Sequence, residues 1–397
     1  MADLRVFAKT IEDEALRQVE MLLAQEPFRD CKVRIMPDVH AGKGCVIGFT
    51  ADLGDKVIPN IVGVDIGCGM LTIEWGKVEL SLDALDRTIR EKVPFGRNVH
   101  DGRVARFPQM LDLRCYRDLK DAKRLERSIG SLGGGNHFIE VDADDPGNKY
   151  LVIHTGSRNL GKQVAEYYQK LAIDLMSGKD ALFAAQKKLI ADYKAAGRRA
   201  EIQAEIKKLY QSFRGKKPDV PDALCYLTGE YRDDYLHDMR ICQAYAVQNR
   251  ATIAEILCGA MGLSEKGRFE TIHNYIDHDS NIVRKGAIRA AKGERLLIPI
   301  NMRDGCIVGI GKGNDDWNQS APHGAGRLMS RHKAREVLSL DEYQKSMADI
   351  FTTSVGADTI DEAPMAYKPM DEILETIGDT VEVDRIIHPI YNFKASE

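Results

Sequence analysis

Residues 57–70 read VIPNIVGVDIGCGM, a short apolar run that passes directly into a glycine-rich turn. We interpret Val57–Val64 as a β-strand and the glycines after it as a loop, where the backbone can approach a ligand closely. The turn carries Asp65 and Cys68. A carboxylate and a thiolate on one turn can reach a single ion, and a thiolate can bridge two. The alternative is a buried structural cysteine, the commoner role of a lone Cys beside glycines.

The same pattern recurs along the chain. Short apolar segments indicate two more strands, Tyr150–His154 and Leu296–Ile300. Polar residues gathered in loops beside strands suggest that distant segments assemble one site. We therefore expect one catalytic domain over residues 1–397. The other glycine-rich runs with His, Asp, Asn or Cys lie at 36–48, 130–140, 154–161, 273–287 and 305–327.

Helical patterns account for other parts of the chain. Ser81 is a suitable N-cap for a helix that continues to Val93, and apolar residues recur at helical spacing over 234–261. Residues 180–213 are rich in Ala, Lys, Glu and Gln with Gly197 near their middle, which predicts two amphipathic helices. We expect an α+β fold with this helical hairpin, residues 180–215, inserted in the catalytic domain.

Composition narrows the class of protein. A net charge of −4 argues against a broad non-specific coat for nucleic acid but leaves room for a local basic groove. Eight cysteines without a CxxC motif, and a first segment without an apolar core, predict reduced thiols in a cytoplasmic protein. No apolar run approaches the roughly 18 residues of a membrane span. The hairpin has a basic face that either contacts RNA or is simply solvated, which is commoner: Lys187, Lys188, Arg198, Arg199, Lys207 and Lys208.

Four histidine motifs carry the remaining chemistry: GGGNHFIE (133–140), HTGSR (154–158), HNYI (273–276) and HGAGR (323–327). Three glycines before His137 leave backbone N–H groups where an anion could sit, and Arg158 suits bidentate contact with phosphate. Imidazole, carboxylate and thiolate donors together fit Zn, Mn, Fe or Co. A lone His is more often structural, but six of the ten lie in glycine-rich loops: His40, His137, His154, His273, His278 and His323.

With these motifs the chain resembles the RtcB family of RNA ligases from about residue 30 to Lys394. The matching segments are, in the family's order, MPDVHAGKG (36–44), VGVDIGCGM (62–70), GGGNHFIE, HTGSR, HNYI with RKGA (284–287), HGAGR and PMAYK (364–368). Seven motifs in one order make chance agreement implausible. The resemblance implies a GTP-dependent and Mn²⁺-dependent enzyme that joins broken RNA ends.

The resemblance implies two Mn²⁺ ions per active site that share a bridging cysteine, here Cys68. It assigns His137 and His154 to one ion, and Asp65 and His273 to the other. Two nearby cations can neutralise phosphate charge and orient the attacking and leaving oxygens.

The resemblance also implies how the nucleotide is used. His323 matches the nucleophile that attacks the α-phosphorus of GTP, and Tyr367 could stack on guanine. The GMP then passes to an RNA 3′-phosphate, which the 5′-hydroxyl of a second RNA attacks as GMP leaves. A 2′,3′-cyclic phosphate is first opened to a 3′-phosphate. Besides His323, the positions implied to hold the nucleotide are Asn136, Glu140, Arg158, Asn301, Gly324, Ala325, Gly326, Arg327, Tyr367 and Lys394.

The chain departs from the family at residues 299–305, which read PINMRDG where a Gly-Ser-Met-Gly stretch is usual. Asn301 stands for the serine, and Arg303 brings bulk and charge where glycine is usual. We therefore expect a divergent paralogue that differs from common members in nucleotide affinity, in base preference or in the fit of RNA.

Two other functions compete with RNA ligation. A dinuclear phosphodiesterase that only opens cyclic phosphates would need the metals but not His323. An RNA-binding factor with a structural metal site would need four closing ligands but no additional Asn, Glu and Arg. The expected partners are broken RNA, such as tRNA or rRNA fragments, GTP, and an activating protein of the archease kind.

Overall fold

The longer of two main sheets carries most of the predicted site. The computed structural model describes residues 2–42, 44–213 and 215–395. The sheet has eight strands in the order β13-β14-β17-β6-β7-β5-β9, with β16 paired to β17 outside this path. Its strands are β5 (Gly69–Gly76), β6 (Phe138–Ala143), β7 (Lys149–Thr155), β9 (Gly267–Ile272), β13 (Arg295–Asn301), β14 (Gly305–Gly311), β16 (Phe351–Thr352) and β17 (Val381–Lys394).

This sheet curls until its two ends approach each other. The backbone N–H of Leu297 in β13 donates to Thr271 Oγ1 in β9 at 3.2 Å. Side chains of antiparallel strands alternate between the two faces, and one face forms a shared apolar cluster. Its buried members are Met70, Phe138, Tyr150, Val152, Leu297, Cys306, Val308 and Ile387.

The second sheet has five strands in the order β1-β2-β3-β11-β10. It brings the N-terminal part of the chain beside residues 274–285. Two small ribbons, β12-β15 and β4-β8, complete the strands of the described residues. The bounds are β1 (Asp3–Val6), β2 (Lys32–His40), β3 (Ile47–Asp52), β4 (Lys56–Val57), β8 (Leu227–Thr228), β10 (Asn274–Ile276), β11 (Ile282–Lys285), β12 (Ala287–Arg289) and β15 (Ser320–Pro322).

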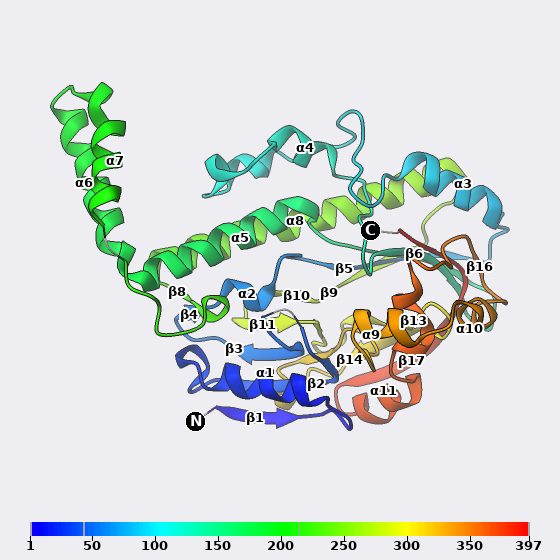
Figure 1. Ribbon diagram of the computed structural model, residues 1–397. Helices are drawn as coiled ribbons and strands as arrows, with labels where there is room; N and C mark the ends of the chain where they lie inside the picture. The colour runs from blue at the N-terminus through cyan, green and yellow to red at the C-terminus, as the bar shows by residue number, and fades with distance from the viewer. Residues whose placement is uncertain (1, 43, 214, 396–397) are drawn as a thin grey trace.

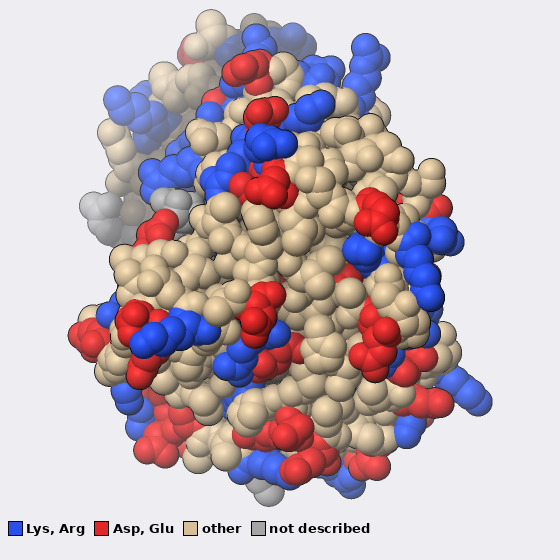
Figure 2. All heavy atoms as spheres, turned by 90° about the vertical axis from the view of Figure 1, so that its right-hand side faces the viewer, with Lys and Arg blue, Asp and Glu red and all other residues tan. Residues whose placement is uncertain are grey.

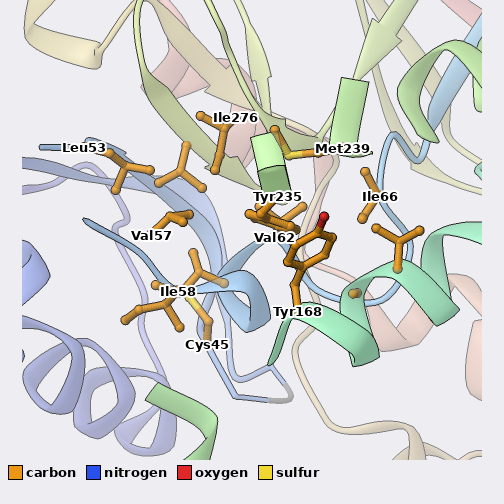
Figure 3. Packing of buried hydrophobic residues seen from close by; sticks show 14 of the residues in the cluster. Cys45, Leu53, Val57, Ile58, Val62, Ile66, Tyr168, Tyr235, Met239 and Ile276 are labelled. Atoms are coloured by element: carbon orange, nitrogen blue, oxygen red, sulfur yellow. The ribbon is translucent and has the colours of Figure 1, made fainter. Parts of the chain in front are cut away.

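Two long helices, α5 (Arg158–Asp174) and α8 (Gly229–Met261), run side by side above the sheets (Figure 1). Figure 3 shows how they close the core, with Tyr168 of α5 and Tyr235 and Met239 of α8 meeting Val62 and Ile276. No helix within the described residues is both long and apolar enough to cross a membrane. The other α-helices are α1 (Asp13–Leu23), α2 (Pro59–Val62), α3 (Leu82–Lys92), α4 (Ala122–Arg127), α9 (Arg331–Val337), α10 (Leu340–Ser346) and α11 (Met370–Ile377).

The predicted hairpin is present as α6 (Asp180–Ala195) and α7 (Ile202–Ser212). It projects from the end of α5 away from the rest of the molecule (Figure 1). Gly178, with φ of 82°, bends the chain out of α5, and Gly197, with φ of 71°, lies in the turn between the two helices.

Most elements predicted from the sequence are confirmed, but one strand is wrong. Tyr150–His154 and Leu296–Ile300 lie within β7 and β13, and Ser81 Oγ caps α3 by accepting from the Ala84 N–H at 3.3 Å. The expected strand Val57–Val64 is instead the end of β4 followed by the short helix α2. Pro59 occupies the first helical position, where its fixed φ and missing N–H favour helix.

Candidate active site

The predicted metal ligands converge from four separate segments. Cys68 lies between α2 and β5, and the N–H of His273, which follows β9, donates to the Cys68 carbonyl at 3.0 Å. His154 in β7 pairs with residues of β5 and β6, while His137 lies immediately before β6. The register of the sheet therefore places residues up to about 200 positions away in the sequence around the side chain of Cys68.

The donor atoms form two groups that share the Cys68 sulfur. Cys68 Sγ lies 3.5 Å from His137 Nε2 and 3.3 Å from His154 Nε2, and His137 Nε2 lies 3.0 Å from Asp65 Oδ2. The ligand atoms of Asp65, Cys68 and His137 lie within 4.8 Å of one another, and so do those of Cys68, His154 and His273. These groups differ from the expected pairing, in which His137 goes with His154 and Asp65 with His273. A shared sulfur between two groups is what a bridging thiolate requires.

Hydrogen bonds to backbone carbonyls orient two of the imidazoles. His137 Nδ1 lies 2.9 Å from the Leu132 carbonyl, and His154 Nδ1 lies 3.1 Å from the Asn136 carbonyl. Because a carbonyl only accepts, each Nδ1 carries the proton and each Nε2 presents its lone pair toward Cys68. The buried Nδ1 of His273 has no hydrogen-bond partner among the described residues. Such an orphan beside a thiol and a second imidazole fits a bound cation.

Burial sets the protonation of the anionic donors. It raises the pKa of the Cys68 thiol well above the usual value, and the charge of Asp65 adds to this effect. A thiolate at Cys68 therefore needs a cation beside it. The mixed N, O and S donor set suits a first-row transition metal.

His323 follows β15, and its ring is held by Asp38, which comes from β2. His323 Nδ1 lies 2.6 Å from Asp38 Oδ2, and the same oxygen accepts from the His323 backbone N–H at 3.1 Å. The ring centroid of His323 lies 4.9 Å from that of His273. The predicted nucleophile therefore lies next to the predicted metal ligands, and its Nε2 forms no hydrogen bond with any residue that the structure describes.

The close approach of two loops explains the glycine at position 326. Gly326 has φ of 78°, and a Cβ built there would lie 2.3 Å from the Asp38 carbonyl oxygen. Only glycine fits this turn without strain. The HGAGR motif thus packs directly on the residue that orients His323.

A cleft of about 770 Å³ opens beside His323. His154 and His273 lie in its wall, whereas Asp65 and His137 do not, so the group Cys68, His154 and His273 faces the cleft. Every predicted nucleotide residue except Arg158 lines it: Asn136, Glu140, Asn301, His323, Gly324, Ala325, Gly326, Arg327, Tyr367 and Lys394.

Glu362 organises the cationic end of this cleft. Its carboxylate accepts from Tyr367 Oη at 2.8 Å and from Arg331 Nη1 at 2.5 Å, and it pairs with Lys394 Nζ. Burial acts to raise its pKa, but the charges of Lys394 and Arg331 prevail and lower it to about 2. With Arg327 Nη1 3.5 Å from Glu362, three cations surround one carboxylate. Arg331 also pairs with the buried Asp361 at 2.6 Å, so three cations face two carboxylates, and the remaining positive charge suits an anionic ligand.

Arg158 lies apart from the other predicted nucleotide contacts. It begins α5 with φ of 55°, and its guanidinium donates to Ser131 Oγ at 3.1 Å and to the Gly96 carbonyl at 2.8 Å. A Cβ on Gly133 would meet both Arg158 Nη1, at 1.8 Å, and His137 Nδ1, at 2.8 Å. The arginine thus contacts the side of the metal ligands that faces away from the cleft.

The unusual 299–305 segment forms a self-contained turn between β13 and β14. Asn301 Oδ1 accepts from the backbone N–H groups of Arg303 and Asp304, and Asn301 Nδ2 donates to Asp304 Oδ2 at 2.8 Å. The Arg303 guanidinium pairs with Asp304 at 2.7 Å and does not line the cleft. Pro299, Ile300 and Met302 line the cleft together with Asn301, so of the two departures Asn301 faces the cleft and Arg303 does not.

A second cysteine cluster lies below the floor of the cleft. The ligand atoms of Glu140, Asp142 and Cys306 lie within 4.8 Å of one another, and all three residues are buried. Burial raises the pKa of Glu140 to about 7, and burial with the Glu140 charge raises that of Asp142 well above its usual value. Both Asp142 oxygens lack a hydrogen-bond donor among the described residues. Protons can neutralise this pair, so the cluster needs no ion.

The fold and the site define a candidate dinuclear metal enzyme, with the predicted nucleophile His323 beside a cleft whose wall includes Arg327, Arg331 and Lys394. The family model described as "tRNA-splicing ligase RtcB" matches residues 20–114 and 115–395, and the chain belongs to the RtcB family. It is 29% identical to the RNA-splicing ligase RtcB of Escherichia coli K12 over 96% of this chain and 95% of that protein. It is 23% identical to the tRNA-splicing ligase RtcB of Aeropyrum pernix, over 97% and 92% of the two chains, and 26% identical to the Mycobacterium tuberculosis protein, over 86% and 91%.

The sequence patterns did not predict Glu362, Arg331 or Asn392 as site residues, and they did not define the role of Asp38. Glu362 lies two positions before Pro364, the first residue of the PMAYK motif, so an acid near a predicted nucleotide motif was the available signal. Asn392 lies opposite Glu140 on β17 and donates to its carboxylate. It was not recognisable without the register of β17.

Proposed function

We propose that this chain is a GTP-dependent and Mn²⁺-dependent ligase that joins RNA 3′-phosphate or 2′,3′-cyclic phosphate ends to 5′-hydroxyl ends through a His323–GMP intermediate. The printed names of the relatives, RNA-splicing and tRNA-splicing ligase, support the substrate. The observation that carries the proposal is His323: Asp38 holds its Nδ1 at 2.6 Å, and its ring lies 4.9 Å from that of His273. A nucleophilic imidazole is thereby held beside two candidate metal sites.

Asp38 prepares His323 for attack. When Nδ1 carries the proton and donates it to the buried carboxylate, the lone pair stays on Nε2. Nε2 attacks the α-phosphorus of GTP, a P–N bond forms, and the bond to the pyrophosphate oxygen breaks. Asp38 stabilises the positive charge that develops on the imidazole, as a carboxylate beside a catalytic histidine does.

The cationic end of the cleft would hold the nucleotide. Lys394, Arg327 and Arg331 surround Glu362, and Tyr367 presents its ring beneath the Arg327 guanidinium at 5.0 Å. These groups can pair with phosphate or with polar base edges, while Glu140 and Asn136 line other parts of the wall. The pocket is preformed, because its polar groups already contact one another.

The metal donors fit two transition-metal ions that share Cys68. Asp65, Cys68 and His137 would hold one ion, and Cys68, His154 and His273 the other. When bound, the ions would neutralise phosphate charge and lower the barrier to displacement at phosphorus.

The later steps use the P–N bond made at His323. An oxygen of the RNA 3′-phosphate attacks the bound GMP phosphorus, the P–N bond breaks, and the RNA gains a pyrophosphate-linked GMP. The 5′-hydroxyl oxygen then attacks the 3′-phosphorus, GMP leaves, and the hydroxyl proton passes to solvent. GMP is the leaving group that makes this last displacement feasible.

Labelling with α-³²P-GTP and Mn²⁺ tests the proposal. Wild-type chain and His388→Ala, which changes an exposed histidine, should both take up label that is stable to base and released by acid. His323→Ala should take up none. Acid-stable label would contradict a phosphoramidate, and opening of cyclic phosphates without any labelling would favour a phosphodiesterase.

A further inference from the structure

Positive charge is concentrated in one segment, the arm (residues 180–217). The arm has ten Lys and Arg but four Asp and Glu, a net charge of +6 in a chain whose total is −4. The rest of the chain therefore carries −10. On the face opposite the arm, cations and carboxylates are interspersed (Figure 2). The charge of the arm thus differs in sign and density from that of the body.

Most of these cations are free to bind a ligand. Arg198 pairs with Glu201 and Lys208 with Glu205. Seven others are exposed and form no ion pair with any described residue: Lys187, Lys188, Lys194, Arg199, Lys207, Lys216 and Lys217. Unpaired cations at this density repel one another, so the free arm gains stability from a polyanion.

The architecture of the arm leaves its outer faces open. α6 and α7 contact each other, with Tyr210 Oη donating to Gln186 Oε1 at 2.7 Å. Lys187 and Lys194 are seven residues apart and so share one side of α6. The exposed Ala184 and Ala191 lie on one flank of these lysines, and the half-buried Ile190 lies on the other.

α5 links the arm to the metal cluster. Its first residue, Arg158, lies beside His137, and the helix continues for 17 residues to Asp174. At about 1.5 Å per residue this helix is about 25 Å long. That length corresponds to roughly seven phosphates of one strand at about 3.4 Å each. An RNA that ends in the active site must extend at least this far to reach the arm.

We propose that the arm is a second RNA-binding site, which holds the phosphate backbone of the substrate RNA away from the break. The proposal rests on the proposed function, because the RNA it binds is the substrate of that site. Lysines spaced along two helices contact phosphates without reading bases, so the arm selects for length and structure of the RNA and not for sequence. It favours large folded fragments over short oligonucleotides.

Charge reversal on α6 tests this role without touching the active site. The variant is Lys187→Glu, Lys188→Glu and Lys194→Glu in the full chain. The matched control is Arg29→Glu, Lys77→Glu and Arg87→Glu, which changes the net charge equally at exposed residues of the body. Binding of a 40-nucleotide hairpin RNA and of an 8-nucleotide RNA, both with 5′-hydroxyl ends, is measured by fluorescence anisotropy across a KCl series.

The arm variant should bind the hairpin about 10-fold more weakly or worse near 0.1 M salt, and its log–log salt dependence should be shallower by about two to three. Its affinity for the short RNA should match that of the control. Equal hairpin affinities of arm variant and control would overturn the proposal. So would a loss that is the same for both RNAs.

Excision of the arm gives a second, independent variant. The Lys216 N–H donates to the Ser177 carbonyl at 3.0 Å, so the two ends of the arm meet and a short Gly-Ser linker can replace residues 179–215. It should label with GTP like the wild type but join hairpin fragments more slowly than short ones. If wild-type chain neither labels nor joins any RNA, the proposed function fails. If the wild type joins RNA and the excised form joins both lengths equally well, the arm proposal alone fails.

Discussion

Two buried clusters on the same curled sheet each combine a cysteine with carboxylates, yet they differ in chemistry. The cluster around Cys68 has three imidazoles and one carboxylate, and His154 and His273 open to the cleft. The cluster around Cys306 has Glu140 and Asp142 and no imidazole. In the Cys68 cluster, neutral imidazoles direct their lone pairs toward a sulfur that needs a cation to ionise. In the second, burial drives the acids to hold protons.

The difference shows why proximity of donors does not by itself define a metal site. At Cys68 the imidazoles are oriented by carbonyls, so their protons point away from the sulfur. The Cys306 cluster contains no oriented imidazole, and a proton shared between Glu140 and Asp142 can neutralise the pair. We therefore expect the two clusters to respond in opposite ways to loss of metal and to change of pH.

The largest effect is expected for Cys68→Ala. Loss of the shared sulfur should reduce bound Mn²⁺ below one ion per chain and abolish joining, more than loss of Asp65 or His273 alone. Cys306→Ala should keep its metal, because that cluster is neutralised by protons. Elemental analysis of both variants after dialysis against Mn²⁺ decides the matter; full metal in Cys68→Ala would refute the bridging role.

His323→Ala should separate nucleotide transfer from the metal cluster. It should fail on a 3′-phosphate end but still seal RNA that already carries a 3′-terminal GMP pyrophosphate, because that substrate enters after the lost step. Asp65→Ala should fail on both substrates. The comparison is a sealing assay on matched RNAs, and failure of a folded, metal-loaded His323→Ala on capped RNA would give His323 a further role.

Asp38→Asn should reduce the rate of GMP labelling by about 10²–10⁴-fold, because the amide cannot stabilise the charged imidazole and can favour the wrong tautomer. Metal content should stay unchanged, since Asp38 contacts His323 and not the cysteine cluster. Single-turnover labelling gives the rate. A variant that labels normally would show that the carboxylate only fixes the loop.

Asp142→Asn should make stability less sensitive to alkaline pH. Burial and the charge of Glu140 raise the pKa of Asp142 well above its usual value in the folded chain, so the stability linked to this carboxyl is present at acid pH and lost as pH rises. At pH 8 the free energy of unfolding of the variant should exceed that of the wild type by at least about 1.4 kcal/mol, the equivalent of one pKa unit. At pH 5 the two free energies of unfolding should be equal.

The control for that measurement is Asp144→Asn. Burial acts to raise the pKa of Asp144, but hydrogen bonds from Asn148 and Tyr150 lower it, so this variant should lose stability at pH 8. Urea titrations at pH 5 to 8 provide the free energies. If the free energy of unfolding at pH 8 changes in the same direction in both variants, burial does not hold the Glu140–Asp142 pair protonated.

The smallest effect is expected in the 299–305 turn. Arg303→Gly should change the preference for GTP over ATP by less than about threefold, because its guanidinium pairs with Asp304 outside the cleft. Asn301→Ser should alter it more, since Asn301 lines the wall. Competition labelling with both nucleotides would show a larger role for Arg303 if its variant changed preference most.

Sequence patterns predicted the chemistry better than the geometry. The five candidate ligands and His323 do converge, because their motifs lie at strand ends that the sheet register brings together. The grouping of His137 with Asp65 was not predictable, since spacing along the chain does not tell which ring nitrogens share a side of the sulfur. The apolar run Val57–Val64 predicts a strand, because a short buried helix and a buried strand share the same apolar pattern.

The place of β17 has a consequence for the timing of synthesis. This strand pairs with β14 on one side and β6 on the other, and it ends at Lys394 in the cleft. A chain still on the ribosome has β6 and β14 without the strand between them, so both edges are open to wrong partners. Demand for chaperones should therefore last until β17 has emerged, and no chain can gain a complete cleft before residue 394 has left the ribosome.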